Sequence, residues 1–213
     1  MKHQAMKRAL LIVITAAAGL TQTAKLGIFT NEGNVGQTPP GCAARYDAAT
    51  GEYRITGGGA NVWAASDAFY YVWKQVSGDI TLSADVQWVG PSDIAHRKAM
   101  LMVRQNLDAG SAYADAVSHG DGLTSLQFRG AGNEQTYQVF TQIEGKVRLR
   151  IWRKGSRYTM FAGKPGEALK PVGPIEYVSL KDPVYVGLGV CSHVADKLET
   201  AVFSNVTLEP ASK

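Results

Sequence analysis

The sequence predicts an all-β fold, with two antiparallel sheets packed as a jelly-roll-like β-sandwich. Short stretches in which apolar and polar residues alternate recur along the chain, and turn signals separate them. No stretch of 12 or more residues has convincing helical periodicity. About a dozen short strands joined in this way are typical of a sandwich of two sheets.

The N-terminal segment has the pattern of a secretory signal peptide. Basic residues in its first eight positions precede the apolar stretch 9–18, and small and polar residues follow. An ordinary N-terminal helix is the weaker alternative, because the segment has no acidic residue and no amphipathic stripe. We expect residues 1–24 to be removed, with cleavage between about Ala18 and Lys25. The apolar stretch is too short to span a bilayer.

Removal of this segment changes the charge of the protein. The full chain has 22 Lys and Arg against 18 Asp and Glu, and three of the basic residues lie within residues 1–24. The remaining chain is therefore close to neutral, at about +1, and roughly 190 residues long, which suits one β domain with a sizeable core. A near-neutral surface argues against nucleic acid as a partner.

The segment 57–73 organises the predicted fold, because a glycine-rich loop there leads into an aromatic run. Phe69, Tyr71 and Trp73 point to one side of an extended chain, and the residues between and after them point to the other, as in a strand with one buried face. A helix would leave Tyr71 opposite the other two aromatic residues. We expect Phe69, Tyr71 and Trp73 to face the core.

The other expected strands follow from the same alternation and from turn signals such as AATG at 48–51 and SGD at 77–79. Residues 25–41 are expected to be rich in loops after a short strand at 26–30. The remaining expected strands are 42–47, 52–57, 80–89, 97–105, 111–119, 122–129, 136–143, 146–154, 157–163, 184–193 and 199–208.

Two cysteines, Cys42 and Cys191, remain near opposite ends of the processed chain. An even number of cysteines in an exported protein indicates a disulfide bond. The alternative is a pair of buried thiols that act as small hydrophobic side chains.

Several stretches in order resemble a known family: GEYRITGGGANVWAASDAFYYVW, SGDITLSADV, RKAMLMVRQ, GLTSLQFR, VRLRIWRKGSRYTMFAG, VYVGLGVCSH and AVFSNVTL. They are similar to secreted bacterial domains of the concanavalin A-like lectin/glucanase superfamily, in the laminin G-like group often labelled DUF1349. The resemblance implies that residues 25–213 form one sandwich domain with a concave sheet that holds glycans in relatives elsewhere in the superfamily. The chain departs from the group at 165–170, where PGEALK replaces a turn that carries Trp.

Catalytic motifs are weak in this sequence. Glycoside hydrolases need two carboxylates about 5 to 9 Å apart, and the glucanases of the superfamily carry them on one strand as Glu-x-Asp-x-x-Glu. Asp115 and Asp85 each lie within an expected strand, but neither has a second acid beside it. A G-x-S-x-G nucleophile motif is also missing from the sequence. A hydrolase assembled from separate strands remains an alternative.

Metal sites are only weakly indicated. His96, His119 and His193 have neither helical nor Cys/His spacing, so the sequence does not predict a zinc site. Jelly-roll sandwiches often hold a structural calcium ion through loop oxygens, and Asp67 or Asp121 could contribute to such a site.

The strongest candidate for a binding site follows from the alternation within the strands. The more apolar side of each strand is taken to face the core, and the polar and aromatic residues on the opposite side are the candidates. Arginine, glutamine and histidine donors pair with sugar hydroxyls, and aromatic rings cover the apolar face of a pyranose. We expect four of these residues to line one concave surface, with Trp152 and His119 nearer its rim; an ordinary polar outer face is the alternative. The four lining residues are Tyr70, Arg104, Arg129 and His193, and the other candidates are Tyr113, Asp115 and Gln127.

These observations favour an exported, non-catalytic domain that binds a glycan or polysaccharide. A glycoside hydrolase or polysaccharide lyase acting at the same groove is one alternative. A structural or protein-interaction module of laminin G type is another.

Overall fold

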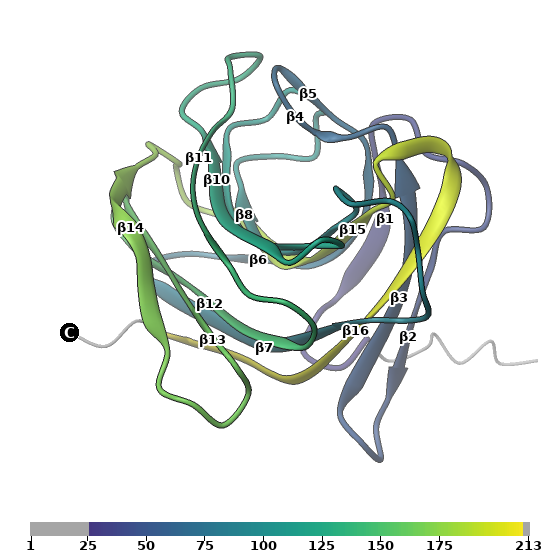
Figure 1. Cartoon of the computed structure of the whole chain (residues 1–213). Helices are drawn as coiled ribbons and strands as arrows, with labels where there is room; N and C mark the ends of the chain where they lie inside the picture. Colours follow the sequence, from purple (N-terminus) through teal and green to yellow (C-terminus); the bar gives the residue numbers. More distant parts are fainter. Residues whose placement is uncertain (1–25, 211–213) are drawn as a thin grey trace, which may run out of the picture.

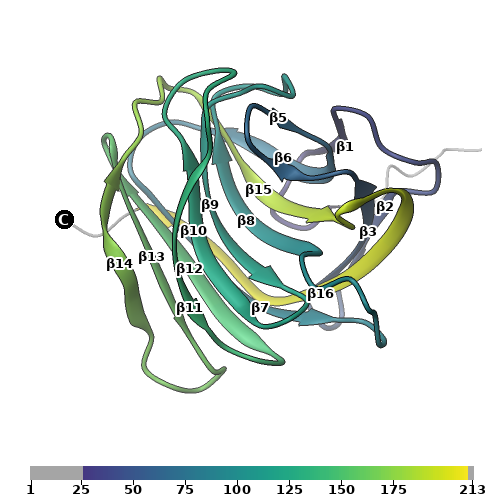
Figure 2. The ribbon, with the colours of Figure 1, turned by 45° about the horizontal axis from the view of Figure 1, so that its top comes forward.

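The computed structural model describes residues 26–210, which form sixteen strands and no helix. Fourteen of these strands make two antiparallel sheets of seven strands each, and the other two form a small hairpin. Figures 1 and 2 show one sheet curled inside the other. The predicted all-β sandwich is therefore confirmed. Within the described residues, no helix is long and apolar enough to cross a membrane.

The curled sheet is called the concave sheet below. Its strands, in spatial order, are β1 (Asn31–Val35), β6 (Phe69–Val76), β15 (Val184–Cys191), β8 (Lys98–Arg104), β9 (Tyr113–His119), β10 (Leu123–Arg129) and β11 (Tyr137–Gln142).

The other sheet is called the outer sheet. In spatial order it contains β14 (Lys170–Tyr177), β13 (Arg157–Gly163), β12 (Val147–Lys154), β7 (Ile80–Trp88), β16 (Val194–Pro210), β3 (Glu52–Gly59) and β2 (Ala43–Asp47). The hairpin of β4 (Val62–Trp63) and β5 (Ser66–Asp67) lies at the open side of the concave sheet (Figure 1).

The main core fills the space between the two sheets. Alternate residues of the concave sheet, such as Leu101 and Leu188, pack there with Leu82 of the outer sheet. The sheets approach closely where β15 crosses β3. Only glycine fits at position 57 there, because a Cβ would collide with the carbonyl of Val190. The GGG segment at 57–59 therefore ends strand β3 and is not the loop that the sequence suggested.

A second apolar cluster lies on the opposite side of the concave sheet. Phe69, Tyr71 and Trp73 belong to it, whereas Tyr70 and Val72 lie in the main core. The expected orientation of β6 is therefore wrong. Both sides of the strand are almost fully buried over residues 69–73, so the more aromatic side did not identify the core between the sheets.

Most expected strands are present with boundaries within two residues of those expected, although β16 begins at Val194 rather than at 199. Three features were missed. The 26–30 strand is replaced by β1 at 31–35, β14 was not expected, and the 60–68 loop contains the β4–β5 hairpin. The predicted signal peptide lies outside the described residues.

The expected disulfide is not formed, because Cys42 and Cys191 are both free. Cys42 packs against the main core, whereas Cys191 belongs to the cluster on the other side of the concave sheet. Each thiol donates a weak hydrogen bond to a nearby carbonyl, from Cys42 to Pro39 and from Cys191 to Gly59, at 3.4 Å in both cases. They act as small, separately packed side chains.

Candidate functional site

Polar and charged side chains gather on the concave side of the sheet, opposite the main core. On β8, β9 and β10 they alternate with core residues such as Val103, Ala116 and Leu126, and alternation therefore places them together on the other face. Each is at most 3% exposed: Lys98, Arg104, Asp115, His119, Gln127 and Arg129.

One half of this face is closed by the β4–β5 hairpin. Arg129 donates two hydrogen bonds to the Asp67 carboxylate, at 2.9 and 2.7 Å, and Arg104 approaches the same carboxylate at 3.5 Å. Burial raises the pKa of Asp67, and the hydrogen bonds from Arg129 oppose that shift. All three side chains are fully buried, so they form an internal ion-pair cluster.

Arg129 also holds the backbone of the hairpin. Its Nε donates to the carbonyl of Ala64 at 3.0 Å, and Thr136 donates to the same carbonyl at 2.9 Å. Ala64 has a φ of 51°, so these bonds fix a left-handed turn in a residue that is not glycine. The guanidinium of Arg129 lies over the ring of Tyr113, 4.9 Å from its centroid. Arg104, Tyr113 and Arg129 were expected to line a groove, but the hairpin covers them.

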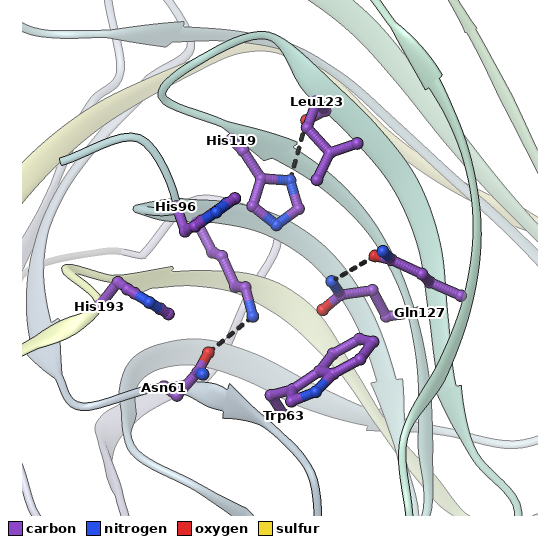
Figure 3. A pocket seen from close by; sticks show the side chains of 9 residues that line it. Asn61, Trp63, His96, His119, Leu123, Gln127 and His193 are labelled. Atoms are coloured by element: carbon purple, nitrogen blue, oxygen red, sulfur yellow. Dashed lines mark hydrogen bonds between the residues drawn. The ribbon is translucent and has the colours of Figure 1, made fainter.

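The other half of the face opens into a pocket of about 200 Å³ beside the hairpin (Figure 3). Its lining comes from five separate parts of the chain, and no member is a carboxylate. The lining residues are Asn61, Trp63, His96, Lys98, His119, Leu123, Gln127, Gln138 and His193.

Two hydrogen-bond acceptors face this pocket. Gln127 donates from Nε2 to Gln138 at 3.1 Å, while its buried Oε1 has no hydrogen-bond partner among the described residues. His119 Nδ1 lies 2.8 Å from the carbonyl of Leu123, and a carbonyl can only accept, so Nδ1 carries the proton. The Nε2 lone pair of His119 therefore points into the pocket (Figure 3).

Donors lie at the other end of the pocket. Lys98 Nζ donates to Asn61 Oδ1 and to the carbonyl of Val62, both at 2.7 Å. An ammonium has three N–H groups, so one remains available. Lys98 lies 5.5 Å from the centroid of the Trp63 ring, and Figure 3 shows His193 beside Asn61 at this end.

The three histidines come together in space although they are distant in sequence. The His96 ring lies 6.0 Å from that of His119 and 5.5 Å from that of His193, measured between centroids. Burial, with a smaller effect of Lys98, lowers the pKa of His119 to about 4 and also lowers the pKa of His193. These two imidazoles are therefore neutral at pH 7, with lone pairs available to a ligand.

Asp115 occupies the middle of the face on β9 and is fully buried. Neither of its carboxylate oxygens has a hydrogen-bond partner among the described residues. Burial raises its pKa well above the usual value, and the nearby Lys98 opposes that shift only in part. Asp115 is absent from the lining of the pocket, so it does not act as an exposed carboxylate there.

The calcium ligands that were considered are not assembled. The Asp67 oxygens are bound by arginines, and Asp121 lies in an exposed turn where Oδ1 accepts from the backbone N–H of Leu123. Within residues 26–210, no group of three or more His, Cys, Asp and Glu side chains has a geometry suited to a metal ion.

Two predicted site residues lie away from the pocket. Tyr70 is in the main core, where its hydroxyl donates to Glu32 at 2.8 Å. Trp152 is on β12 of the outer sheet, in a shallow groove of about 870 Å³ with Arg150 and Phe161. No described residue of that groove has a buried polar atom without a partner. The expectation that both residues share a surface with His193 is therefore wrong.

His119, Gln127 and His193 are the predicted candidates that the structure brings together around the pocket. Sequence reasoning missed Asn61, Trp63, Lys98 and Gln138 as pocket residues. The alternation rule could have found Lys98, since it lies two residues before Met100 on the same side of β8. The segment carrying Asn61 and Trp63 was read as a loop, to which the rule does not apply.

Comparison with solved structures shows the same fold in proteins of distant sequence. A functionally unknown protein from Saccharomyces cerevisiae aligns with a TM-score of 0.63 and 16% identity, over 83% of this chain and 95% of its own. A carbohydrate-binding module, CBM66 from Bacillus subtilis, aligns with a TM-score of 0.54 and 21% identity, over 85% of this chain and 97% of its own.

A larger protein, GH43B of a xyloglucan PUL from Bacteroides ovatus, aligns with a TM-score of 0.55 and 17% identity. The alignment covers 76% of this chain but only 33% of that one, so the similarity concerns one part of the larger protein. Neither a family model nor a curated protein sequence matches this chain. At these identities the comparisons show the fold alone.

Proposed function

We propose that this chain is an exported, non-catalytic domain that binds a glycan, with one sugar ring in the pocket between Trp63 and Gln127. The buried Gln127 Oε1, which has no partner among the described residues, carries this proposal. An unpaired buried acceptor costs about 1 to 3 kcal/mol, and a ligand hydroxyl would satisfy it. The neighbouring His119 Nε2 offers a second acceptor, so two hydroxyl groups can be bound side by side.

The shape and composition of the pocket support a sugar. The indole of Trp63 forms one wall, and an aromatic wall suits the apolar C–H face of a pyranose. Its volume of about 200 Å³ is below the roughly 300 to 1,000 Å³ of sites for drug-sized ligands, which favours a single ring over a long chain segment. The fold is shared with a carbohydrate-binding module, which agrees with this assignment.

The charges around the pocket favour binding over hydrolysis. A glycosidase places two carboxylates on either side of the scissile bond. Among the described residues, none of those that line the pocket is Asp or Glu. Asp115, a fully buried acid on this face, has a pKa raised by burial and does not line the pocket.

Two tryptophan variants of the purified protein, residues 25–213, test the site. Screening against a glycan array identifies a ligand, and titration calorimetry then measures its affinity. Trp63→Ala removes the aromatic wall, so affinity should fall by at least about tenfold, given the free energy of burying an aromatic ring. Trp152→Ala is the matched control, because this half-buried tryptophan lies on the outer sheet.

Loss of affinity in Trp152→Ala with unchanged affinity in Trp63→Ala would move the site to the outer sheet. If no oligosaccharide binds at millimolar concentration, the protein-interaction alternative replaces the glycan proposal. Release of reducing sugar during the titrations would favour the hydrolase. Export is tested separately by N-terminal sequencing of the protein recovered outside the cytoplasm, where we expect a start between about residues 19 and 25.

A further inference from the structure

The pocket has two chemically different ends. Acceptors lie at one end, where Gln127 Oε1 and His119 Nε2 face the cavity. A buried cation lies at the other end, where Lys98 is 3% exposed and reaches the lining beside Asn61. A neutral sugar would use the acceptors but leave the third N–H of Lys98 without a strong acceptor.

We propose, resting on the glycan-binding function above, that the bound sugar carries an acidic substituent and that Lys98 binds it. A carboxylate or a sulfate ester would meet this requirement, since both present oxygen acceptors with a negative charge. The hydroxyl groups of the same ring donate to Gln127 and His119, and the Trp63 ring covers its apolar face.

The surroundings of Lys98 favour an anion. Its ammonium is held in place by two hydrogen bonds of 2.7 Å, so one N–H has a fixed direction before the ligand arrives. Asn61 Oδ1 accepts from Lys98 and from the N–H of Val62, while Asn61 Nδ2 makes no hydrogen bond within the described residues. Lys98 and Asn61 therefore both supply N–H donors at this end of the pocket, and a hydrogen bond from the ammonium to an anion is charge-assisted and strong.

The ionisable groups around Lys98 do not neutralise it directly. None of them makes an ion pair with its ammonium within 4.0 Å among the described residues. Burial lowers the pKa of Lys98, and the nearby Cys191, Asp115 and Asp67 oppose that shift. The titratable groups that line the pocket besides Lys98 are His96, His119 and His193. Asp121 lies 4.0 Å from His96, and Cys191, Asp115 and Asp67 lie near Lys98 outside the lining.

An acidic ligand makes binding depend on pH in a defined direction. The free protein holds His193, which lies at the Lys98 end of the pocket (Figure 3), neutral at pH 7, because burial and Lys98 disfavour its charged form. A bound anion at Lys98 favours the charged form of His193 and raises its pKa, whereas His119 stays neutral because its Nε2 accepts a hydroxyl of the sugar. Proton binding and ligand binding then reinforce each other, so affinity should increase as the pH falls from 7 to 5. A neutral sugar gives no such increase.

Matched ligands separate charge from shape. The titration compares methyl glucuronide with methyl glucoside, which differ by a carboxylate in place of a CH₂OH group, and includes glucose 6-sulfate as the sulfate arm; galacturonide and galactoside form a second pair. We expect at least one acidic member to bind at least about tenfold more tightly than its neutral partner, the ratio expected for a charge-assisted hydrogen bond. The arm that binds identifies the acidic group.

The Lys98→Met variant tests the role of the ammonium at nearly constant volume. The preference for the acidic ligand should disappear, while Lys146→Met, a control at a half-exposed lysine of the outer-sheet region, should retain it. If Lys98→Met does not fold, NMR titration of the wild-type imidazoles replaces it. The acidic ligand should raise the pKa of His193, and the neutral ligand should leave it unchanged.

Each outcome decides between the two proposals. Equal or tighter binding of the neutral ligands, with dependence on Trp63, overturns the acidic preference and keeps the glycan site. A preference that survives in Lys98→Met overturns the assignment to Lys98, as does a His193 pKa that does not move with the acidic ligand. If no acidic or neutral oligosaccharide of the glycan array binds at millimolar concentration, both proposals fail.

Discussion

Arg129 and Gln127 lie on the same strand and point to the same side of the concave sheet, yet their surroundings differ. Arg129 is covered by the β4–β5 hairpin, and its donors are used by Asp67 and by backbone carbonyls. Gln127 is equally inaccessible to bulk solvent, but one of its atoms has no partner among the described residues. The first residue stabilises the fold, and the second is available to a ligand.

The difference arises from coverage. The hairpin 62–67 lies over Arg129 and Arg104, and its Trp63 lines the pocket. Arg129 therefore positions the wall of the pocket without touching its contents. A polar residue on a concave sheet is a candidate for binding only where its hydrogen-bonding capacity is not already used by the protein.

Replacement of Arg129 by Met should have the largest effect. The variant leaves the Asp67 carboxylate buried with only a 3.5 Å contact to Arg104. Breaking a buried ion pair in this way typically costs about 3 to 5 kcal/mol. We expect the free energy of unfolding, measured by urea denaturation, to fall by that amount.

Arg157→Met is the control for this variant, because Arg157 is exposed at the start of β13. Its effect should stay within about 0.5 kcal/mol, as for most surface substitutions. A decrease of less than about 1 kcal/mol in Arg129→Met would show that the hairpin is held by other contacts, and the distinction between the two halves of the face would be lost.

His119 connects the pocket to acid stability. Its pKa in the folded protein is lowered to about 4, mainly by burial, from an unfolded value near 6.5. The neutral imidazole therefore contributes stability that is present above pH 6.5 and is lost as the pH falls towards 4, a loss of roughly 3 kcal/mol.

His119→Asn should remove this part of the acid sensitivity. The asparagine amide can still donate to the Leu123 carbonyl in place of Nδ1, but it cannot gain a proton in this range. The difference in unfolding free energy between wild type and variant, measured by urea denaturation at pH 4 and pH 7, should change by that roughly 3 kcal/mol. A constant difference across this range would mean that His119 is not buried in its neutral form.

The sequence predicted the strands well because alternation and turn signals are local properties. It missed β14, in which Pro171 and Pro174 interrupt the pattern, and β1, whose residues are mostly polar. Both are edge strands, with hydrogen-bonded neighbours on one side only. At an edge, prolines and polar residues are tolerated, so the local signal is weak.

The site was harder to predict because alternation assigns a side of a strand but neither its sheet nor its cover. Trp152 and Gln127 were grouped together, although β12 and β10 belong to different sheets. Tyr70 was placed on the wrong side because β6 is buried on both. The interaction between Arg129 and Asp67, which are 62 residues apart, depends on a hairpin that no periodic pattern indicates.

Gln127→Met should have the smallest effect on stability and a measurable effect on binding. The change removes the buried acceptor without a partner and the hydrogen bond to Gln138, while it keeps the side-chain volume similar. The variant no longer has to bury an acceptor without a partner, which stabilises it, but it loses the hydrogen bond to Gln138, which destabilises it. These two contributions nearly cancel, so the free energy of unfolding should change by less than about 1 kcal/mol.

In the complex, a hydroxyl of the sugar loses its acceptor in this variant, and the free energy of binding should weaken by about 1 kcal/mol, roughly fivefold in affinity. Calorimetry with the ligand found on the glycan array, together with urea denaturation of both proteins, measures the two effects. A variant that binds as the wild type does would place the sugar away from Gln127, whereas a large loss of stability would mean that Gln127 belongs with Arg129 among the residues that hold the fold.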